Sequence, residues 1–166
     1  VNPLAVLISR VRTARVVESA IGAIVDQVVR EATGDCQTTI DCTLPNRQKW
    51  FHDVVSVELS RLRRAIRRQP DLWVRRFLWV TLAETVRLTS NDRTSTYKLH
   101  ARPVEEITKR ILSPIKLFGE IGAINAESFA DFRIQLHARA QLKAKKYRAE
   151  TEVKIGDTRD LSASWN

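Results

Sequence analysis

The stretch between Asp71 and Leu88 constrains the fold more than any other part of the sequence. As a helix, it is apolar on nearly every side. A helix without a polar face is stable in water only when other elements surround it. We therefore expect this stretch to be the buried centre of a helical domain. Its apolar side chains are Leu72, Trp73, Phe77, Leu78, Trp79, Val80 and Leu82.

Amphipathic segments that can surround this centre lie on both sides of it in the sequence. Asn2 followed by Pro3 is a favoured helix start, a capping side chain and then a proline in the first turn. Apolar side chains recur at helical spacing through most of the chain, which predicts a mainly α fold. Helices are expected from Pro3, from about 17 to 32, from 46 to 68, from 71 to 88, from Pro103, from 115 to 124 and from 126 to 146.

Two stretches have the alternation that is typical of extended chain. Residues 94–99 are rich in Thr and Tyr, and residues 149–155 place Thr151, Val153 and Ile155 on one side. Short strands are therefore expected near 94–99 and 149–155. The second strand has no evident partner in this sequence, and a lone strand is unstable in water. We therefore interpret the chain as a piece of a larger protein.

The charge balance favours a polyanionic partner. Lysine and arginine total 28 against 19 for aspartate and glutamate, which gives a net charge of +9. Nucleic acid is the first class of partner that such a balance favours, and an acidic membrane surface is the second. No apolar stretch approaches the length of a membrane span, and no secretion signal opens the chain. We therefore expect no membrane partner and a cytoplasmic location.

One predicted helix carries arginines that could contact phosphates. Arg61, Arg64 and Arg68 share a face of this helix, roughly opposite its apolar stripe. Phosphate contacts give affinity that falls with salt but carry little sequence information. Arg75 and Arg76 could add further contacts of this kind. The alternative is an arginine face that only keeps the helix soluble.

The polar stretch after the central helix is the better candidate for reading bases or clamping the DNA backbone. Hydroxyl, amide and guanidinium groups alternate there, and phosphate oxygens and base edges bind such groups. The alternative is a polar loop whose Ser and Thr side chains satisfy their own backbone. The candidate residues are Asn91, Arg93, Thr94, Ser95, Thr96, Lys98, His100 and Arg102.

Cysteine and histidine give no sign of a metal site or of a disulfide framework. Cys36 and Cys42 lie in one polar segment without a neighbouring pair of histidines, so we interpret them as free thiols. His52, His100 and His137 do not cluster in the sequence. We expect them to be surface or capping residues and assign no metal ligand.

Three segments follow one another in an informative order. They are Val1-Asn2-Pro3-Leu4-Ala5, the stretch from Ser90 to Pro103, and Gly156-Asp157 after the last predicted strand. Each alone has an ordinary interpretation, as a helix start, a polar loop or a plain turn. Taken in order, they resemble motifs of the DNA amino-methyltransferases, which transfer a methyl group from S-adenosylmethionine to a base amine in DNA. The resemblance spans nearly the whole chain.

The resemblance implies a cofactor wall and a DNA-positioning part. Asn2 and Pro3 would pack beside the ribose of S-adenosylmethionine, and Asp157 would contact its adenine end. Double-stranded DNA is the implied partner, together with the remainder of the same methyltransferase domain. The implied divisions are 1–14 as the edge of a Rossmann-like methyltransferase core, 15–146 as a mostly helical insert that binds DNA, and 147–166 as a return strand of the core.

The sequence also departs from that family. The glycine-rich loop, the ribose-binding acid and the Ser/Asn/Asp-Pro-Pro-Tyr motif are absent. We therefore assign no catalytic residue and expect the chain alone to be inactive. Two alternatives stay open: a free-standing basic helical module that binds nucleic acid without catalysis, and a helical scaffold for acidic protein partners. The module should bind DNA as a folded monomer without cofactor, whereas the scaffold should ignore DNA.

Overall fold

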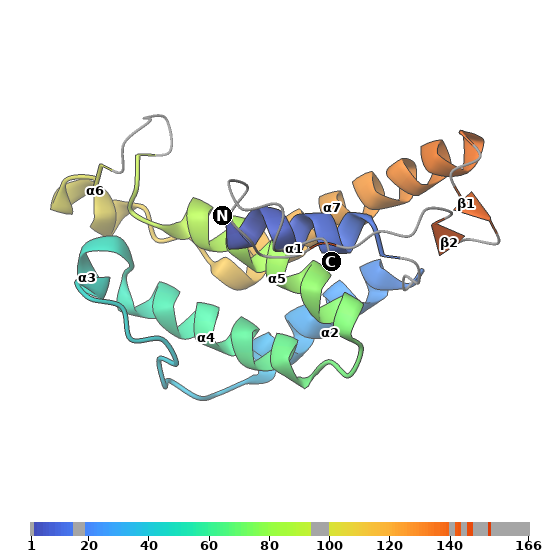
Figure 1. Ribbon diagram of the computed structural model, residues 1–166. Helices are drawn as coiled ribbons and strands as arrows, with labels where there is room; N and C mark the ends of the chain where they lie inside the picture. Colours follow the sequence, from blue (N-terminus) through green and yellow to red (C-terminus); the bar gives the residue numbers. More distant parts are fainter. Residues whose placement is uncertain are drawn as a thin grey trace, which may run out of the picture.

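The structure, a computed structural model, describes residues 2–14, 19–93, 100–139, 142–143, 146–147 and 153. Those residues form a mainly helical molecule (Figure 1), which confirms the main fold class expected from the sequence. A short antiparallel hairpin, β1 (Leu142–Lys143) with β2 (Lys146–Tyr147), follows the last helix. The helices are α1 (Pro3–Arg12), α2 (Ile21–Gly34), α3 (Arg47–Trp50), α4 (Asp53–Arg68), α5 (Leu72–Thr89), α6 (Val104–Lys109) and α7 (Pro114–Ala138).

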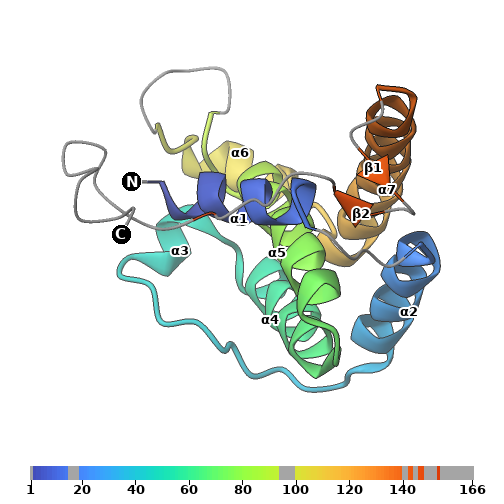
Figure 2. The ribbon, with the colours of Figure 1, turned by 45° about the vertical axis from the view of Figure 1, so that its right-hand side comes forward.

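Helix α5 lies at the centre, as its apolar sequence predicts. It packs against α1, α4 and α7, and it lies between α1 and α4 in both ribbon views (Figures 1 and 2). Helix α2 completes the arrangement by packing against α4 and α7. The removal of apolar side chains from water is the main force that holds these helices together. The fully buried core residues include Val28, Leu62, Ile66, Leu78 and Phe118.

A row of buried threonines runs along α5. Thr81, Thr85 and Thr89 are one helical turn apart, and the hydroxyl of each donates to the carbonyl four residues earlier, at 2.8 to 3.3 Å. Thr81 also accepts a hydrogen bond from Nδ2 of Asn125 on α7, at 3.2 Å. The row therefore satisfies its own hydroxyls inside the core and joins α5 to α7 by a polar contact.

Helices α2 and α7 approach each other closely where α7 carries glycine. A Cβ atom at Gly122 would lie 2.5 Å from Cγ1 of Val25, and one at Gly119 would lie 3.3 Å from Cγ2 of Val29. A close-packed interior has no spare volume for the first of these atoms. The bare backbone of Gly122 thus sets how near the two helices can lie.

The helix starts follow the capping signals in the sequence. Oδ1 of Asn2 accepts a hydrogen bond from the N–H of Leu4 at 3.0 Å, and a side-chain oxygen of Asp71 accepts one from α5 at 2.8 Å. Nδ1 of His52 lies 3.4 Å from the N–H of Val54 and caps α4. The expected starts at Asn2-Pro3 and at Asp71 are therefore confirmed, as is the capping role expected for His52.

The prediction of one helix from 46 to 68 is wrong, because the chain turns a corner near its start. Helix α3 ends at Trp50, Phe51 has extended backbone with φ −141° and ψ 131°, and α4 begins at Asp53. Arg47 forms an ion pair with Asp53 at 2.8 Å across this corner. Apolar periodicity does not reveal a corner that capping and polar contacts stabilise.

The two helices expected at 115–124 and 126–146 are one helix, α7, which ends at Ala138. No proline or glycine separates the two predicted segments, and the Asn125 side chain bonds to α5 instead of ending the helix. Beyond Ala138, the predicted helix is replaced by the hairpin, in which Leu142 pairs with Tyr147.

The two predicted strands fall mostly outside the described residues. Within 149–155 the structure describes Val153, whose carbonyl accepts two hydrogen bonds from the Arg10 guanidinium at 3.0 and 3.1 Å. Arg10 belongs to α1, which packs on α5, where Nε1 of Trp73 donates to the carbonyl of Val11 at 3.0 Å. Helix α1 thus packs onto α5, and its Arg10 also contacts Val153, near the far end of the sequence. The Rossmann-like flanks stay a prediction.

Candidate nucleic-acid interface

Three segments that are far apart in sequence meet at the end of the molecule where α3 and α6 lie (Figure 1). We call residues 47–50, 90–93 and 100–110 the α3–α6 platform. Asn91 joins them, since its N–H donates to the carbonyl of Trp50 and its carbonyl accepts from the N–H of Arg102, both at 2.8 Å. Asn91 is only 5% exposed. Its place in the predicted site is therefore to hold neighbouring backbone in position.

A β-bridge fixes both ends of the stretch that was predicted to read DNA. Asp92 pairs with Ala101, and the N–H of Arg93 donates to the carbonyl of His100 at 2.9 Å. The N–H of His100 in turn donates to the Asp92 carboxylate at 2.9 Å. These contacts thus hold both ends of this stretch in place. The predicted contacts outside the described residues are Thr94, Ser95, Thr96 and Lys98.

Exposed cationic side chains surround the β-bridge between Asp92 and Ala101. Lys49, Arg93 and Lys109 are exposed, and Nζ of Lys49 lies 5.3 Å from the centre of a ring of Trp50. Arg93 and Arg102 both reach the carboxylate of Glu106, at 3.7 and 3.4 Å. Ion pairs that are this exposed contribute little and are screened by salt. A phosphate oxygen can therefore replace Glu106 as their partner.

Two arginines lie deeper in the platform. Arg110 donates to the carbonyls of Ser90 and Leu88 at 3.2 and 3.1 Å, which satisfies the last turn of α5. Burial lowers the pKa of Arg110, and the nearby charge of Arg102 lowers it further. Nε of Arg102 is buried and has no hydrogen-bond partner among the described residues. The positive charges of Arg102 and Arg110 lie close together and are partly buried, which favours the binding of an anion at the adjoining surface.

The central arginine of the predicted α4 face is turned toward the chain itself. Arg64 forms ion pairs with Asp35 and Asp41, each at 2.8 Å, and its side chain is 16% exposed. The hydrogen bond from Arg64 holds the pKa of the Asp35 carboxyl below its ordinary value of 3.8. The same bond raises the pKa of Arg64. In this conformation the guanidinium group already has anionic partners.

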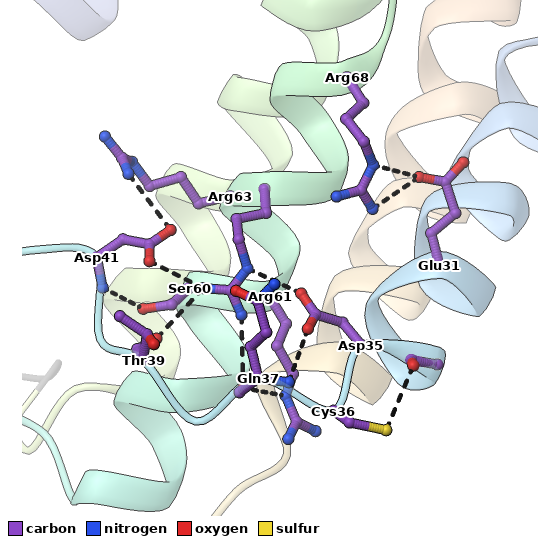
Figure 3. A network of polar contacts seen from close by, with 12 residues as sticks. Glu31, Asp35, Cys36, Gln37, Thr39, Asp41, Ser60, Arg61, Arg63 and Arg68 are labelled. Atoms are coloured by element: carbon purple, nitrogen blue, oxygen red, sulfur yellow. Dashed lines mark hydrogen bonds and ion pairs between the residues drawn. The ribbon is translucent and has the colours of Figure 1, made fainter.

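Three of the other arginines predicted to contact phosphates, Arg61, Arg68 and Arg75, also have partners in the chain. Nε of Arg61 donates to the carbonyl of Gln37 at 3.1 Å, and Arg68 pairs with Glu31 at 3.1 Å (Figure 3). Arg75 donates to the carbonyls of residues 69 and 70, at 2.6 and 2.9 Å, and so satisfies the turn that follows α4. The platform therefore offers the more accessible cationic surface of the two.

The described residues of the expected cofactor wall lie at the start of α1. Asn2 and Pro3 are exposed there, and Oδ1 of Asn2 is engaged in capping the helix. Asp157 lies outside the described residues. The thiols of Cys36 and Cys42 are free and exposed.

The described residues contain neither a cluster of metal ligands nor a helix that could span a membrane. In the described ranges, no three side chains of His, Cys, Asp or Glu gather as metal ligands would. No helix of the same ranges is both long enough and apolar enough to cross a membrane. Comparison with protein-family models, with curated proteins and with solved structures gives no match to this chain.

Lys49, Glu106 and Arg110 are parts of the platform that the sequence did not indicate. Lys49 lies on a segment that has the pattern of an uninterrupted helix. Glu106 and Arg110 have the charges that the helix dipole favours at the two ends of a short helix. Their places in the platform depend on contacts between distant segments, for which the sequence offers no local signal.

Proposed function

We propose that this chain is the DNA-positioning helical part of a DNA amino-methyltransferase that uses S-adenosylmethionine. The α3–α6 platform carries the proposal. Its β-bridge anchors a stretch rich in hydroxyl groups, and Lys49, Arg93 and Lys109 are exposed around it. Lysine and arginine contacts to phosphates position a protein on the duplex, and the anchored stretch would approach the base edges.

The chemistry of such an enzyme explains why a positioning part is needed. The target base has to leave the duplex before its amine can be methylated. Cations that hold the phosphates on either side would keep the DNA in place while the base is rotated out. S-adenosylmethionine supplies the methyl group when bound. Asn2 fits the expected cofactor wall, because its exposed amide group can donate to a ribose hydroxyl.

A second observation supports the interpretation of residues 15–146 as a helical insert in a larger domain. An inserted domain leaves and re-enters its host at neighbouring points. The hydrogen bonds from Arg10 to the carbonyl of Val153 join residues that are 143 positions apart. This contact brings the start of the chain next to Val153, as the insertion of a helical part into a Rossmann-like core would require.

The coding sequence that adjoins this segment tests the methyltransferase proposal. We expect an acidic residue directly before Val1, a glycine-rich loop further upstream, and a Pro-Pro-Tyr or Pro-Pro-Phe motif shortly after Asn166. A start codon directly before Val1 and a stop codon directly after Asn166 would contradict the proposal.

The platform favours a second candidate equally well, a free-standing helical module that binds nucleic acid. Its exposed cations need no cofactor to contact phosphates. The module would bind DNA as a folded monomer, and its binding would be unchanged by S-adenosylmethionine. The adjoining coding sequence separates the two candidates, because only the first requires the flanking motifs.

A further inference from the structure

A segment without regular structure lies across the arginine face of α4 (Figure 3). We call residues 35–41 the strap. It follows α2 directly, and its residues accept hydrogen bonds from Arg61 and Arg64. Besides its two ion pairs, Arg64 donates to the backbone carbonyls of Thr39 and Gln37, at 3.2 and 3.5 Å. A single guanidinium group therefore binds the strap along most of its length.

The strap offers the arginine face the same chemistry that a nucleic-acid backbone would offer. Asp35 and Asp41 supply charged oxygens, and Arg63 reaches Asp41 as a third, longer contact at 3.5 Å. Just before the strap, Glu31 on α2 binds Arg68 in the same way. Phosphate oxygens accept hydrogen bonds from arginine in the same manner as carboxylates do. Acidic side chains of the chain thus occupy the positions that phosphates would take.

Little else in the structure holds the strap. None of its side chains is buried, and residues 36–43, all of them described, take part in no backbone–backbone hydrogen bond outside the helices. Apart from the arginine contacts, the N–H of Asp41 donates to Oγ of Ser60 at 3.0 Å. Ile40 and Leu44 help to line a largely apolar, open pocket of about 240 Å³, so the apolar side chains there are not close-packed. The strap is therefore held mainly by polar contacts near the surface, which salt and competing anions weaken.

We propose that the arginine face of α4 is a second phosphate-binding surface, which the strap covers in the free protein and leaves when a nucleic-acid backbone takes its place. The inference rests on the proposed DNA-binding function and adds an intramolecular competitor to it. The platform, which the strap does not touch in any described contact, makes the first contact with DNA. Arg64 then exchanges Asp35 and Asp41 for phosphates. Arg61 exchanges the carbonyl of Gln37, and Arg68 exchanges Glu31 on α2.

The test compares the whole chain with its D35N/D41N variant in binding to double-stranded DNA over a series of salt concentrations. Removing the two competing charges should strengthen binding by about tenfold at low salt, because more arginines become available to phosphates. The slope of the plot of log affinity against log salt should change little, because both chains make the same phosphate contacts once the strap has left. The matched control is E120Q/E127Q, which removes two exposed acids from α7 and changes the net charge equally.

Hydrogen exchange of the Asp41 amide in the unaltered chain gives a second measurement that needs no variant. Saturating DNA should speed this exchange several-fold, because the bond to Ser60 is lost when the strap leaves. The inference is overturned if D35N/D41N gains no more affinity than E120Q/E127Q, or if DNA binds while exchange at Asp41 is unchanged. If the unaltered chain and both variants bind no DNA at all, the proposed function fails and the inference with it.

Discussion

Gly122 is a position at which one added carbon atom has a large expected effect. A Cβ there would overlap Val25 at 2.5 Å, so Gly122→Ala must push α2 and α7 apart. Overpacking of this kind costs about 1–3 kcal/mol of unfolding free energy. The matched control is Gly22→Ala, where no atom lies within 4 Å of the new Cβ. Urea denaturation of both variants checks the prediction, which fails if they are equally stable.

Thr81 tests the polar contact between α5 and α7. Thr81→Val keeps the shape of the side chain but removes the oxygen that accepts from Asn125. We expect a loss of about 1 kcal/mol, because the half-buried amide of Asn125 is left without its partner. Thr85→Val is the control, because the hydroxyl of Thr85 bonds to its own helix. Thermal or urea unfolding that ranks Thr85→Val as the more damaging change would contradict this account.

At the scale of elements, the strap should make stability depend on pH in the acid range. The pKa of Asp35 is held below 3.8 in the folded chain. A carboxyl with a lowered pKa stabilises the fold fully above its unfolded pKa, near 4, and this contribution disappears as the pH falls through the folded value. The charged groups around it are Arg61 and Arg64 on α4, with Asp41 on the strap.

Asp35→Asn should therefore reduce the difference in unfolding free energy between neutral pH and a pH below 4. The measurement is urea denaturation at the two pH values, with Glu127→Gln as a control that removes an exposed acid from α7. An Asp35→Asn variant whose pH dependence equals that of the control would show that the pair with Arg64 adds nothing to stability.

Helices with strong local signals could be predicted from the sequence. The Asn2-Pro3 start and the Asp71 cap are single-residue signals with a physical cause, and the apolar stretch after Asp71 could only be buried. The corner at Phe51 could not be predicted, because it depends on contacts made after the chain has folded, such as the pair between Arg47 and Asp53. Helix α7 was divided in the prediction although nothing in the sequence breaks it.

The candidate site was predictable in part. The stretch from Asn91 to Arg102 stood out by composition, and the structure anchors both of its described ends by the bridge between Asp92 and Ala101. The partners of the α4 arginines could not be predicted, since their acids lie some 20 to 40 positions earlier in the sequence. Helical periodicity indicates which face carries charge, but it does not indicate what lies opposite that face.

At the scale of the whole molecule, two cationic surfaces differ in how accessible they are. The α3–α6 platform presents Lys49, Arg93 and Lys109 to solvent, whereas the arginine face of α4 is occupied by the strap. The net charge of +9 favours DNA over an acidic protein surface only if such cations gather where a duplex can reach them. We therefore propose that the platform makes the first contact with DNA.

Fluorescence anisotropy with a short labelled DNA duplex, measured over a series of salt concentrations, tests this claim most directly. The unaltered chain should bind at low salt and lose affinity steeply as salt rises. The platform variant K49Q/K109Q should bind more weakly and lower the salt slope by about 2, roughly one for each lost phosphate contact. The control R30Q/K116Q removes two exposed cations from α2 and α7, and it should change the slope much less. Equal behaviour of the two variants, or no binding by the unaltered chain at low salt, would contradict the account.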